Sequence, residues 1–310
     1  MPPNPFMFAS AEESRDKIIK MQKQQIEDLY LDCAANIDKM ARYYEGKQGA
    51  SAALQAQYYN DLKMQVLAQA AEVSKNAEGT ISQNAYLVAD SVASCNTDWC
   101  KNYGIEGQTV DVAFSAICDL SVRTVLSGAI YKDGQGLSSR IWRDLQQTQH
   151  DINMILAQAQ VEQKSVYEAS RDLEDYVNPK KLKNWNLKMS DGRYIYKNKV
   201  DYNAQRLART TAQHAYQKSL VDSTAKNPFV TKFRWWANGT RACPMCLDLD
   251  GLEFDKASLP LDHPMGMCTF EPVMAAESDI INRLADWAAG GKGEDEALDA
   301  FAESLGFDLD

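Results

Sequence analysis

The sequence predicts a mainly α-helical protein that ends in a small α+β module built around a zinc-knot-like Cys/His site. Apolar side chains recur at helical spacing through most of residues 10–178. β-branched and aromatic residues gather at Val230–Trp236, which is typical of a strand. Three cysteines and a histidine follow within a short segment after residue 242. We therefore expect residues 10–178 to form an elongated helical region with short connectors. Its helices would be held by side-to-side packing, since isolated helices gain little stability from propensity alone.

Capping and turn residues divide the N-terminal region. Ser10 followed by Glu13 has the pattern of a capping box, so we expect an extended arm over 1–9 and a long helix over 11–45. Ile19, Ile26, Cys33 and Met40 recur every seven residues along that helix. Further helices are expected over 51–75, 80–95 and 108–128.

Two more helix starts are marked farther along the chain. After the turn at 131–136, Ser138 or Ser139 is expected to cap a helix. Ser165 and Glu168 form another capping-box pattern, and Pro179 ends the helix that they open. Residues 1–178 are therefore expected to form one helical region.

The remainder divides into three segments. Residues 179–200 form a basic linker or hairpin, with a short strand around Tyr194 and Tyr196. Residues 201–275 form the C-terminal module, with a helix over 201–222 and a strand at Val230–Trp236. Residues 276–310 form an acidic helical tail with short helices over 276–289 and 294–305.

Composition limits the class of protein. The net charge is −10, the mean hydropathy is −0.44, and no apolar run reaches the ~18 residues typical of a membrane span. The N-terminus lacks the basic and apolar regions of a secretory signal. Residues 277–310 hold ten acids and two bases. This tail is either a solubilising surface, a binding surface for a basic partner, or a segment whose Ile280, Ile281, Leu284 and Trp287 pack on the module.

The sharpest chemical signal is the set Cys243, Cys246, His263 and Cys268. A Cys-x2-Cys pair on a turn directs two thiolates at one ion, and a distant histidine and cysteine complete a tetrahedron. Zinc prefers such a closed, all-N/S set in structural sites, and four ligands leave no position for a catalytic water. The alternative interpretation is that the cysteines are small buried apolar residues and His263 caps a turn. The odd total of seven cysteines argues against a disulfide framework.

These motifs resemble the C-terminal module of the phage Mu F-like minor head protein family. The resemblance covers about residues 200–273 and consists, in order, of Arg206, Arg209-Thr210, Arg234-Trp235-Trp236, Arg241, Cys243-Pro244-Met245-Cys246, Leu249-Asp250-Gly251, His263-Pro264 and Cys268. Two departures stand out. Asn238-Gly239-Thr240 replaces the usual acid before the first cysteine, and Leu261-Asp262 replaces a proline-rich lead into His263.

The resemblance implies a structural, non-enzymatic minor head protein of a tailed bacteriophage. Such a protein lies in the virion, inside the head near the portal, and assists head morphogenesis or genome packaging and ejection. Its implied partners are the portal protein, the major capsid protein and packaged double-stranded DNA, and its implied cofactor is a structural zinc ion.

Two other function classes remain open. A metal-dependent nuclease or an ADP-ribosylating effector delivered with the DNA requires an open coordination site or pocket acids, for which Asp248 and Asp250 are candidates. A DNA-binding adaptor requires basic contacts. The candidates for contact with DNA or the portal are Lys180, Lys181, Lys183, Lys188, Arg193 and Lys197. A solvated linker between two domains is the simpler explanation of these charges.

Overall fold

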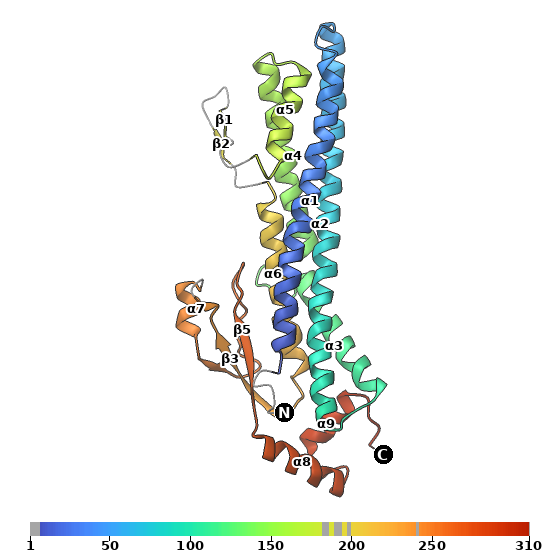
Figure 1. The fold of residues 1–310 in the computed structure, drawn as a ribbon, viewed down its shortest axis with the longest axis vertical. Helices are drawn as coiled ribbons and strands as arrows, with labels where there is room; N and C mark the ends of the chain where they lie inside the picture. Colours follow the sequence, from blue (N-terminus) through green and yellow to red (C-terminus); the bar gives the residue numbers. More distant parts are fainter. Residues whose placement is uncertain (1–6, 182–185, 189–193, 197–199, 240–241, 310) are drawn as a thin grey trace. The chain divides into compact units, whose positions relative to one another are not determined.

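In a computed structural model the chain is mainly helical with a small antiparallel sheet, which confirms the predicted fold class at that level (Figure 1). The structure describes residues 7–181, 186–188, 194–196, 200–239 and 242–309. The chain forms two compact units. Unit 1 comprises Met1–Lys20, Ser82–Gly134 and Arg209–Asp310, and unit 2 comprises Met21–Ile81 and Gln135–Ala208. Each unit combines segments that are far apart in the sequence but in contact in space. The division therefore does not test the segment boundaries expected from the sequence, which stay predictions.

Unit 2 is built from amphipathic helices that bury their apolar stripes. It contains parts of α1 (Ala9–Glu45) and α2 (Ala52–Asn102), all of α4 (Leu137–Val161) and α5 (Val166–Val177), and the start of α6 (Tyr202–Ser223). Its buried side chains include Ile26, Ile37, Leu62, Val66, Ile155 and Leu173. The short strands β1 (Asn186–Lys188) and β2 (Tyr194–Tyr196) pair antiparallel, as a hairpin requires.

The predicted capping box at the start of α5 is confirmed. The Glu168 N–H donates to Ser165 Oγ at 3.2 Å, and the Ser165 N–H donates to the Glu168 carboxylate at 2.7 Å. Two N–H groups that the helix cannot satisfy internally are therefore both bonded.

Two predicted helix starts, those of α1 and α4, are wrong. The expected arm over 1–9 is not extended at its described end, because Phe8 is fully buried in the core and α1 begins at Ala9. Ser10 lies inside α1, where its Oγ is 3.1 Å from the Cys95 sulfur. α4 begins at Leu137 behind Gly136, so neither expected serine caps it; the Ser138 hydroxyl donates to Glu78 instead.

The helices expected over 51–75 and 80–95 are one continuous helix, α2, of 51 residues. Gly79 lies at the expected break but is exposed, and its Cα faces open space. The buried stripe continues past it through Ala77 and Ile81. A helical glycine costs about 1 kcal/mol relative to alanine, which the burial of flanking side chains outweighs. No helix in the described parts of the chain is both long and apolar enough to cross a membrane.

Unit 1 contains a three-stranded antiparallel sheet in the order β4-β3-β5, with the predicted strand β3 (Val230–Trp236) in the centre. Its edges are β4 (Glu253–Phe254) and β5 (Thr269–Met274). Trp235 is opposite Phe270, and their ring centroids are 4.8 Å apart in an edge-on arrangement. The helices of this unit are α3 (Gln108–Ser127), α7 (Pro244–Leu249), α8 (Glu277–Gly290), α9 (Glu296–Ser304) and parts of α1, α2 and α6.

The acidic tail is part of the unit 1 core. The two helices expected there are present as α8 and α9, and Ile280, Leu298 and Phe301 are buried in the core cluster. Phe301 meets Trp99 at 6.5 Å between ring centroids. Ile281, by contrast, is 52% exposed. Of the interpretations that the sequence left open, packing is confirmed for Ile280, Leu284 and Trp287, which lie in or against the core cluster, and is wrong for Ile281.

Candidate metal centre

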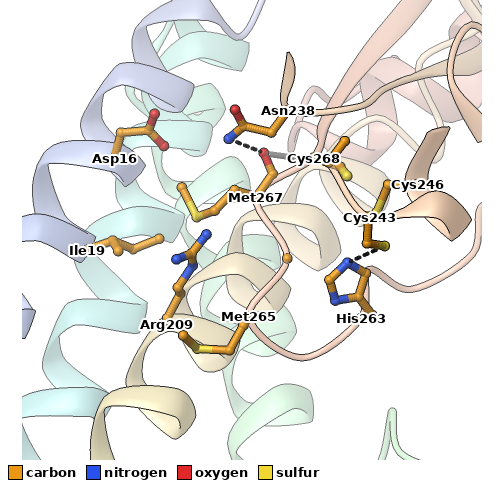
Figure 2. Close-up of a pocket in the computed structure, with 12 residues that line it drawn as sticks. Asp16, Ile19, Arg209, Asn238, Cys243, Cys246, His263, Met265, Met267 and Cys268 are labelled. Atoms are coloured by element: carbon orange, nitrogen blue, oxygen red, sulfur yellow. Dashed lines mark hydrogen bonds between the residues drawn. The ribbon is translucent and has the colours of Figure 1, made fainter. Parts of the chain in front are cut away.

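The four predicted ligands lie together in unit 1 (Figure 2). Ligand atoms of Cys243, Cys246 and His263 all lie within 4.8 Å of one another, and so do those of Cys246, Cys268 and Asp262. The two sets share Cys246, so the three thiols and the imidazole form one cluster that could hold a metal ion. Cys246 and Cys268 are 2% exposed, whereas Cys243 and His263 are partly exposed.

The start of α7 positions the first two thiols. Cys243 is the N-cap residue with an extended backbone, and Pro244 occupies the first helical position, where proline's fixed φ and missing N–H fit. Cys246 is three residues beyond the cap, so the two side chains lie on one side of the turn. The Cys-x2-Cys spacing is therefore built into a helix start.

His263 has a defined tautomer. Its Nδ1 is 2.8 Å from the carbonyl oxygen of Pro264, and because a carbonyl only accepts, Nδ1 carries the proton. Nε2 is then a lone-pair acceptor, and it lies 3.4 Å from the Cys243 sulfur. A metal-binding histidine typically donates its other ring N–H to such a partner. The ring nitrogen without the proton is thus the one that faces the Cys243 sulfur.

Asp262 organises the second pair of ligands. Its carboxylate accepts the backbone N–H of His263 at 2.8 Å and the backbone N–H of Cys268 at 3.1 Å. It also accepts a hydrogen bond from Gln213 Nε2 at 2.8 Å. The side chain is buried, and these three donors satisfy it without a metal ion. We therefore interpret Asp262 as the residue that holds the loop between His263 and Cys268 in place.

A polar stripe on α6 holds the same loop. Gln213 Nε2 also donates to the Cys268 carbonyl at 2.8 Å, and His214 Nε2 donates to the Asp262 carbonyl at 2.8 Å. Gln217 accepts the Asp262 N–H at 2.9 Å and donates to the Pro260 carbonyl at 2.6 Å. Thr210, Gln213, His214 and Gln217 have the 0, 3, 4, 7 spacing of one helix face. This polar face of α6 is therefore buried against the segment 260–268, which carries His263 and Cys268 and is called the ligand loop below.

A buried arginine reaches the site from α1. Arg15 is fully buried, and its Nη1 donates to the Cys268 carbonyl at 3.2 Å. Asp16 pairs with the same guanidinium at 2.8 Å, which also lies 4.8 Å from the ring centroid of Tyr216. With Gln213, Arg15 gives the Cys268 carbonyl two donors. The backbone of Cys268 is thus held on both sides, at its N–H by Asp262 and at its C=O by Arg15 and Gln213.

A β-turn lies between the histidine and the last cysteine. The Gly266 N–H donates to the His263 carbonyl at 2.8 Å, which closes a β-turn through Pro264 and Met265. The residue with positive φ is Met265, at 69°, a position where glycine is usual. Gly266 is the fourth residue of this turn, and the unusual backbone conformation belongs to Met265.

The ionisable ligands influence each other's protonation. A hydrogen bond from the Cys246 backbone N–H, followed by His263, holds the pKa of the Cys243 thiol below its usual value. Burial raises the pKa of Cys246 and of Cys268. For His263, burial lowers the pKa, but the Pro264 carbonyl, Asp262 and Cys243 together outweigh it and the net direction is upward. Without metal, Cys243 is thus the thiol closest to a thiolate.

The ligands line one wall of a cavity of about 400 Å³. Its other wall includes Asp16 and Ile19 from α1, Arg209 from α6, and Met265 and Met267 from the ligand loop (Figure 2). Cys243 is the exposed sulfur of the cluster and faces this space, whereas Cys246 and Cys268 are nearly covered.

Other motif residues support the module's backbone. The Asp250 carboxylate accepts the Ala237 N–H at 2.8 Å, just after β3 ends. The Gly251 N–H donates to the Trp235 carbonyl at 2.8 Å, and Gly251 has a φ of 76°, which favours glycine. The Leu249-Asp250-Gly251 motif thus joins α7 to the central strand.

Two of the six basic candidates, Lys180 and Lys181, lie among the fully described residues, and both belong to unit 2. Lys180 is exposed, and Lys181 pairs with Glu174 and with Asp175, the latter at 2.8 Å. Lys183, Arg193 and Lys197 lie outside the described residues, as does the side chain of Lys188. The possible DNA or portal contact stays a prediction.

Sequence reasoning missed the residues that support the ligands. Asp262 reads as an ordinary loop acid, and His214 as an ordinary helix residue. The available signal was the run of polar residues at helical spacing on 210–217, since a soluble helix usually buries its apolar side. Arg15 carried no signal, because 253 residues separate it from Cys268.

Comparison with known proteins adds no relative. No known family model, curated protein or solved structure matches this chain.

Proposed function

We propose that this protein is a structural minor head protein of a tailed bacteriophage, located in the virion inside the head near the portal. In this role it assists head morphogenesis or the packaging and ejection of the genome. The resemblance of residues 200–273 to the Mu F-like module supplies the assignment. The observation that carries it furthest is that Cys243, Cys246, His263 and Cys268, matched as motif positions, form one cluster.

Other matched positions are part of the same unit, which supports the proposal. Thr210 accepts the Met265 N–H at 3.1 Å, and Arg209 lines the cavity beside the ligands. Asp250 and Gly251 join α7 to β3. A chance likeness of scattered residues would not require these positions to be neighbours.

The proposed cofactor is a structural zinc ion held by Cys243, Cys246, His263 and Cys268. Three sulfurs and one imidazole nitrogen are the set that zinc favours in closed sites. The Nδ1–H bond of His263 to Pro264 leaves Nε2 facing the sulfurs, and the carboxylate of Asp262 is already satisfied. When bound, zinc would link α7 to the loop before β5 and so make that surface rigid.

The proposed role is non-enzymatic. A full set of four protein ligands leaves the ion without a position for water, so the zinc has a structural task. Asp250, a candidate acid for a nuclease, is bonded to the Ala237 N–H. The partners that we propose are the portal protein and the major capsid protein, with packaged double-stranded DNA as a further contact through the basic segment.

Analysis of particles tests the assignment. Phage particles from the source of this sequence are purified on a gradient, with and without a prior high-salt wash, and the proteins in filled and empty heads are measured by mass spectrometry. We expect the chain in both kinds of head, in few copies. Its absence from particles while it is abundant in the infected-cell lysate would overturn the proposal.

A second experiment separates the module from the rest of the chain. His263→Ala and Cys268→Ala, introduced together in the phage, are expected to reduce the yield of filled heads, whereas Cys118→Ala, a buried cysteine in α3, is the matched control. The same purified variants are assayed for nuclease and ADP-ribosyl transferase activity. Metal-dependent activity in the parent that the double variant lacks would favour the effector class.

A further inference from the structure

We propose that Cys243 and Cys246 are an oxidation site, at which a hydroperoxide converts the two thiols into a disulfide and thereby removes two sulfurs from the metal-binding set. This inference goes beyond the proposed function, and it holds for the metal-free protein as well. It rests on exposure, on the distance between sulfurs and on how firmly each cysteine is held.

Exposure selects the first thiol. All seven cysteines lie within the described residues, and six of them are buried. Cys243 is the partly exposed one, and it lines the cavity of about 400 Å³. A small oxidant in solvent therefore meets the sulfur of Cys243 before that of any other cysteine, since access limits thiol oxidation.

The distance between sulfurs identifies Cys246 as the second thiol, the one that forms the disulfide with oxidised Cys243. The Cys246 sulfur is within 4.8 Å of the Cys243 sulfur, so modest side-chain movement brings them to the ~2.05 Å of a disulfide. The pair is separated by two residues at the start of α7, so closing the bond requires no movement of distant segments.

Cys268 is a competitor that the surrounding contacts restrain. It also lies within 4.8 Å of Cys246. However, Asp262 holds its N–H, while Arg15 and Gln213 hold its carbonyl. By comparison, the contacts of the Cys243 thiol are with the partly exposed His263 and with Cys246, its proposed disulfide partner. The geometry therefore favours the pair Cys243–Cys246.

The chemistry balances with hydrogen peroxide as oxidant. The Cys243 sulfur attacks one peroxide oxygen, the O–O bond breaks, and a sulfenic acid and one water are formed. The Cys246 sulfur then attacks the sulfenic sulfur and displaces a second water. In total, two thiols lose two hydrogens and one peroxide yields two waters. A bound ion would keep His263 and Cys268, and two ligands hold it far more weakly than four.

Peptide mapping of the full-length protein tests the pairing. The reduced protein, metal-free or loaded with zinc, is treated with increasing hydrogen peroxide, alkylated and digested with trypsin. Cleavage after Arg241, Lys256 and Arg283 separates Cys243 and Cys246, on peptide 242–256, from Cys268, on peptide 257–283. We expect peptide 242–256 to lose both alkyl groups and to have a mass two hydrogen atoms below its unalkylated reduced form, without a cross-link to peptide 257–283. In the zinc-loaded sample we expect zinc to be released to a chromogenic chelator.

Variants test the order of events. In the metal-free protein, Cys243→Ser should slow the peroxide-dependent loss of Cys246 alkylation by about tenfold or more, because the accessible thiol is gone. Cys118→Ser, a buried cysteine outside the cluster, should leave that rate unchanged. An unchanged rate in Cys243→Ser, or a cross-link between the two peptides, would overturn the inference.

Different results would contradict the proposed metal centre and the proposed oxidation site. A protein that binds no zinc but forms the Cys243–Cys246 disulfide contradicts the proposed metal centre alone. A protein that binds zinc but keeps Cys243 reduced while its buried cysteines oxidise contradicts the oxidation site alone.

Discussion

The carboxylate of Asp262 occupies the space in which a side chain on Gly266 would begin. A Cβ on Gly266 would lie 2.1 Å from Asp262 Oδ1 and 2.2 Å from its Cγ. Asp262 is itself held by Gln213 and by two backbone N–H groups, so it has little room to retreat. Glycine is thus required here for space, whereas the strained φ of the same turn belongs to Met265.

A double-mutant cycle tests this relationship. Gly266→Ala should destabilise the protein by about 1–3 kcal/mol, the usual cost of overpacking. In an Asp262→Ala background the same change should cost much less, because the obstructing carboxylate is gone. Chemical denaturation of the four proteins measures both costs. Equal costs in the two backgrounds would contradict the assigned clash.

Arg15 is predicted to contribute far more to the stability of the fold than Lys17, an exposed residue on the same helix. Arg15→Met should cost roughly 3 kcal/mol, because a buried guanidinium that serves Asp16 and the Cys268 carbonyl is lost. Lys17→Met is the control: its pair with Glu13 is solvent-exposed, so it should cost less than about 0.5 kcal/mol. Thermal unfolding of both variants gives the comparison, and similar losses would refute the buried role.

Removal of metal should loosen the module without unfolding the chain. The ligand loop is held by Asp262, Arg15 and α6, and unit 1 has a large apolar core of its own. With an excess of a zinc chelator, we expect the helical circular dichroism at 25 °C to persist while the midpoint of thermal unfolding falls. Collapse of the helical signal on chelation would show instead that the metal supplies the folding energy.

The pair Arg283–Asp295 should contribute an acid-sensitive link between α8 and the N-cap of α9. The hydrogen bond from Arg283 Nη2 is 2.9 Å, and it holds the pKa of Asp295 below its ordinary value. For a carboxyl with a lowered folded-state pKa, the stabilisation is present above the unfolded pKa and is lost as the pH falls through the folded one. Asp295→Asn should therefore lose stability at pH 7 and approach the parent toward pH 2. The exposed Asp286→Asn is the control, and no convergence at low pH would disprove the link.

Gly79→Ala should stabilise the protein by about 0.5–1 kcal/mol. Gly79 is exposed within the continuous helix α2, and an added Cβ meets no atom within 4 Å. Gly251→Ala is the opposite control, since Gly251 has a positive φ and the change should destabilise. A loss of stability in Gly79→Ala, measured by thermal unfolding, would indicate a break or kink at that position.

Features that depend on neighbours in the chain were predictable. The capping box of Ser165 and Glu168, the strand at Val230–Trp236 and the grouping of four ligands follow from local spacing, and each is present. Strand β5 was not predicted, because Pro272 lies within it. Proline is tolerated there since β5 is an edge strand that pairs with β3 alone.

Features that depend on distant contacts were not predictable. Whether Gly79 breaks a helix depends on the apolar stripe on either side and on what covers it. The polar face of α6 is visible in the spacing of residues 210–217, but that it is buried depends on the loop that covers it. Asp262 and Arg15 could not be predicted as buried for the same reason. Charged residues are usually exposed, and only their distant partners in the fold show that these two are not.

The bond between Arg15 and the Cys268 carbonyl, 253 residues away, also has a consequence during synthesis. Unit 2 ends at Ala208, so its last residue is added to the chain before any residue of the sheet or of α7 in unit 1. At about 5–20 residues per second, the guanidinium of Arg15 waits roughly 13–50 seconds for its carbonyl. Over that interval the apolar residues beside Arg15 on the nascent chain lack their final neighbours, and exposed apolar segments of this kind are what chaperones bind during synthesis.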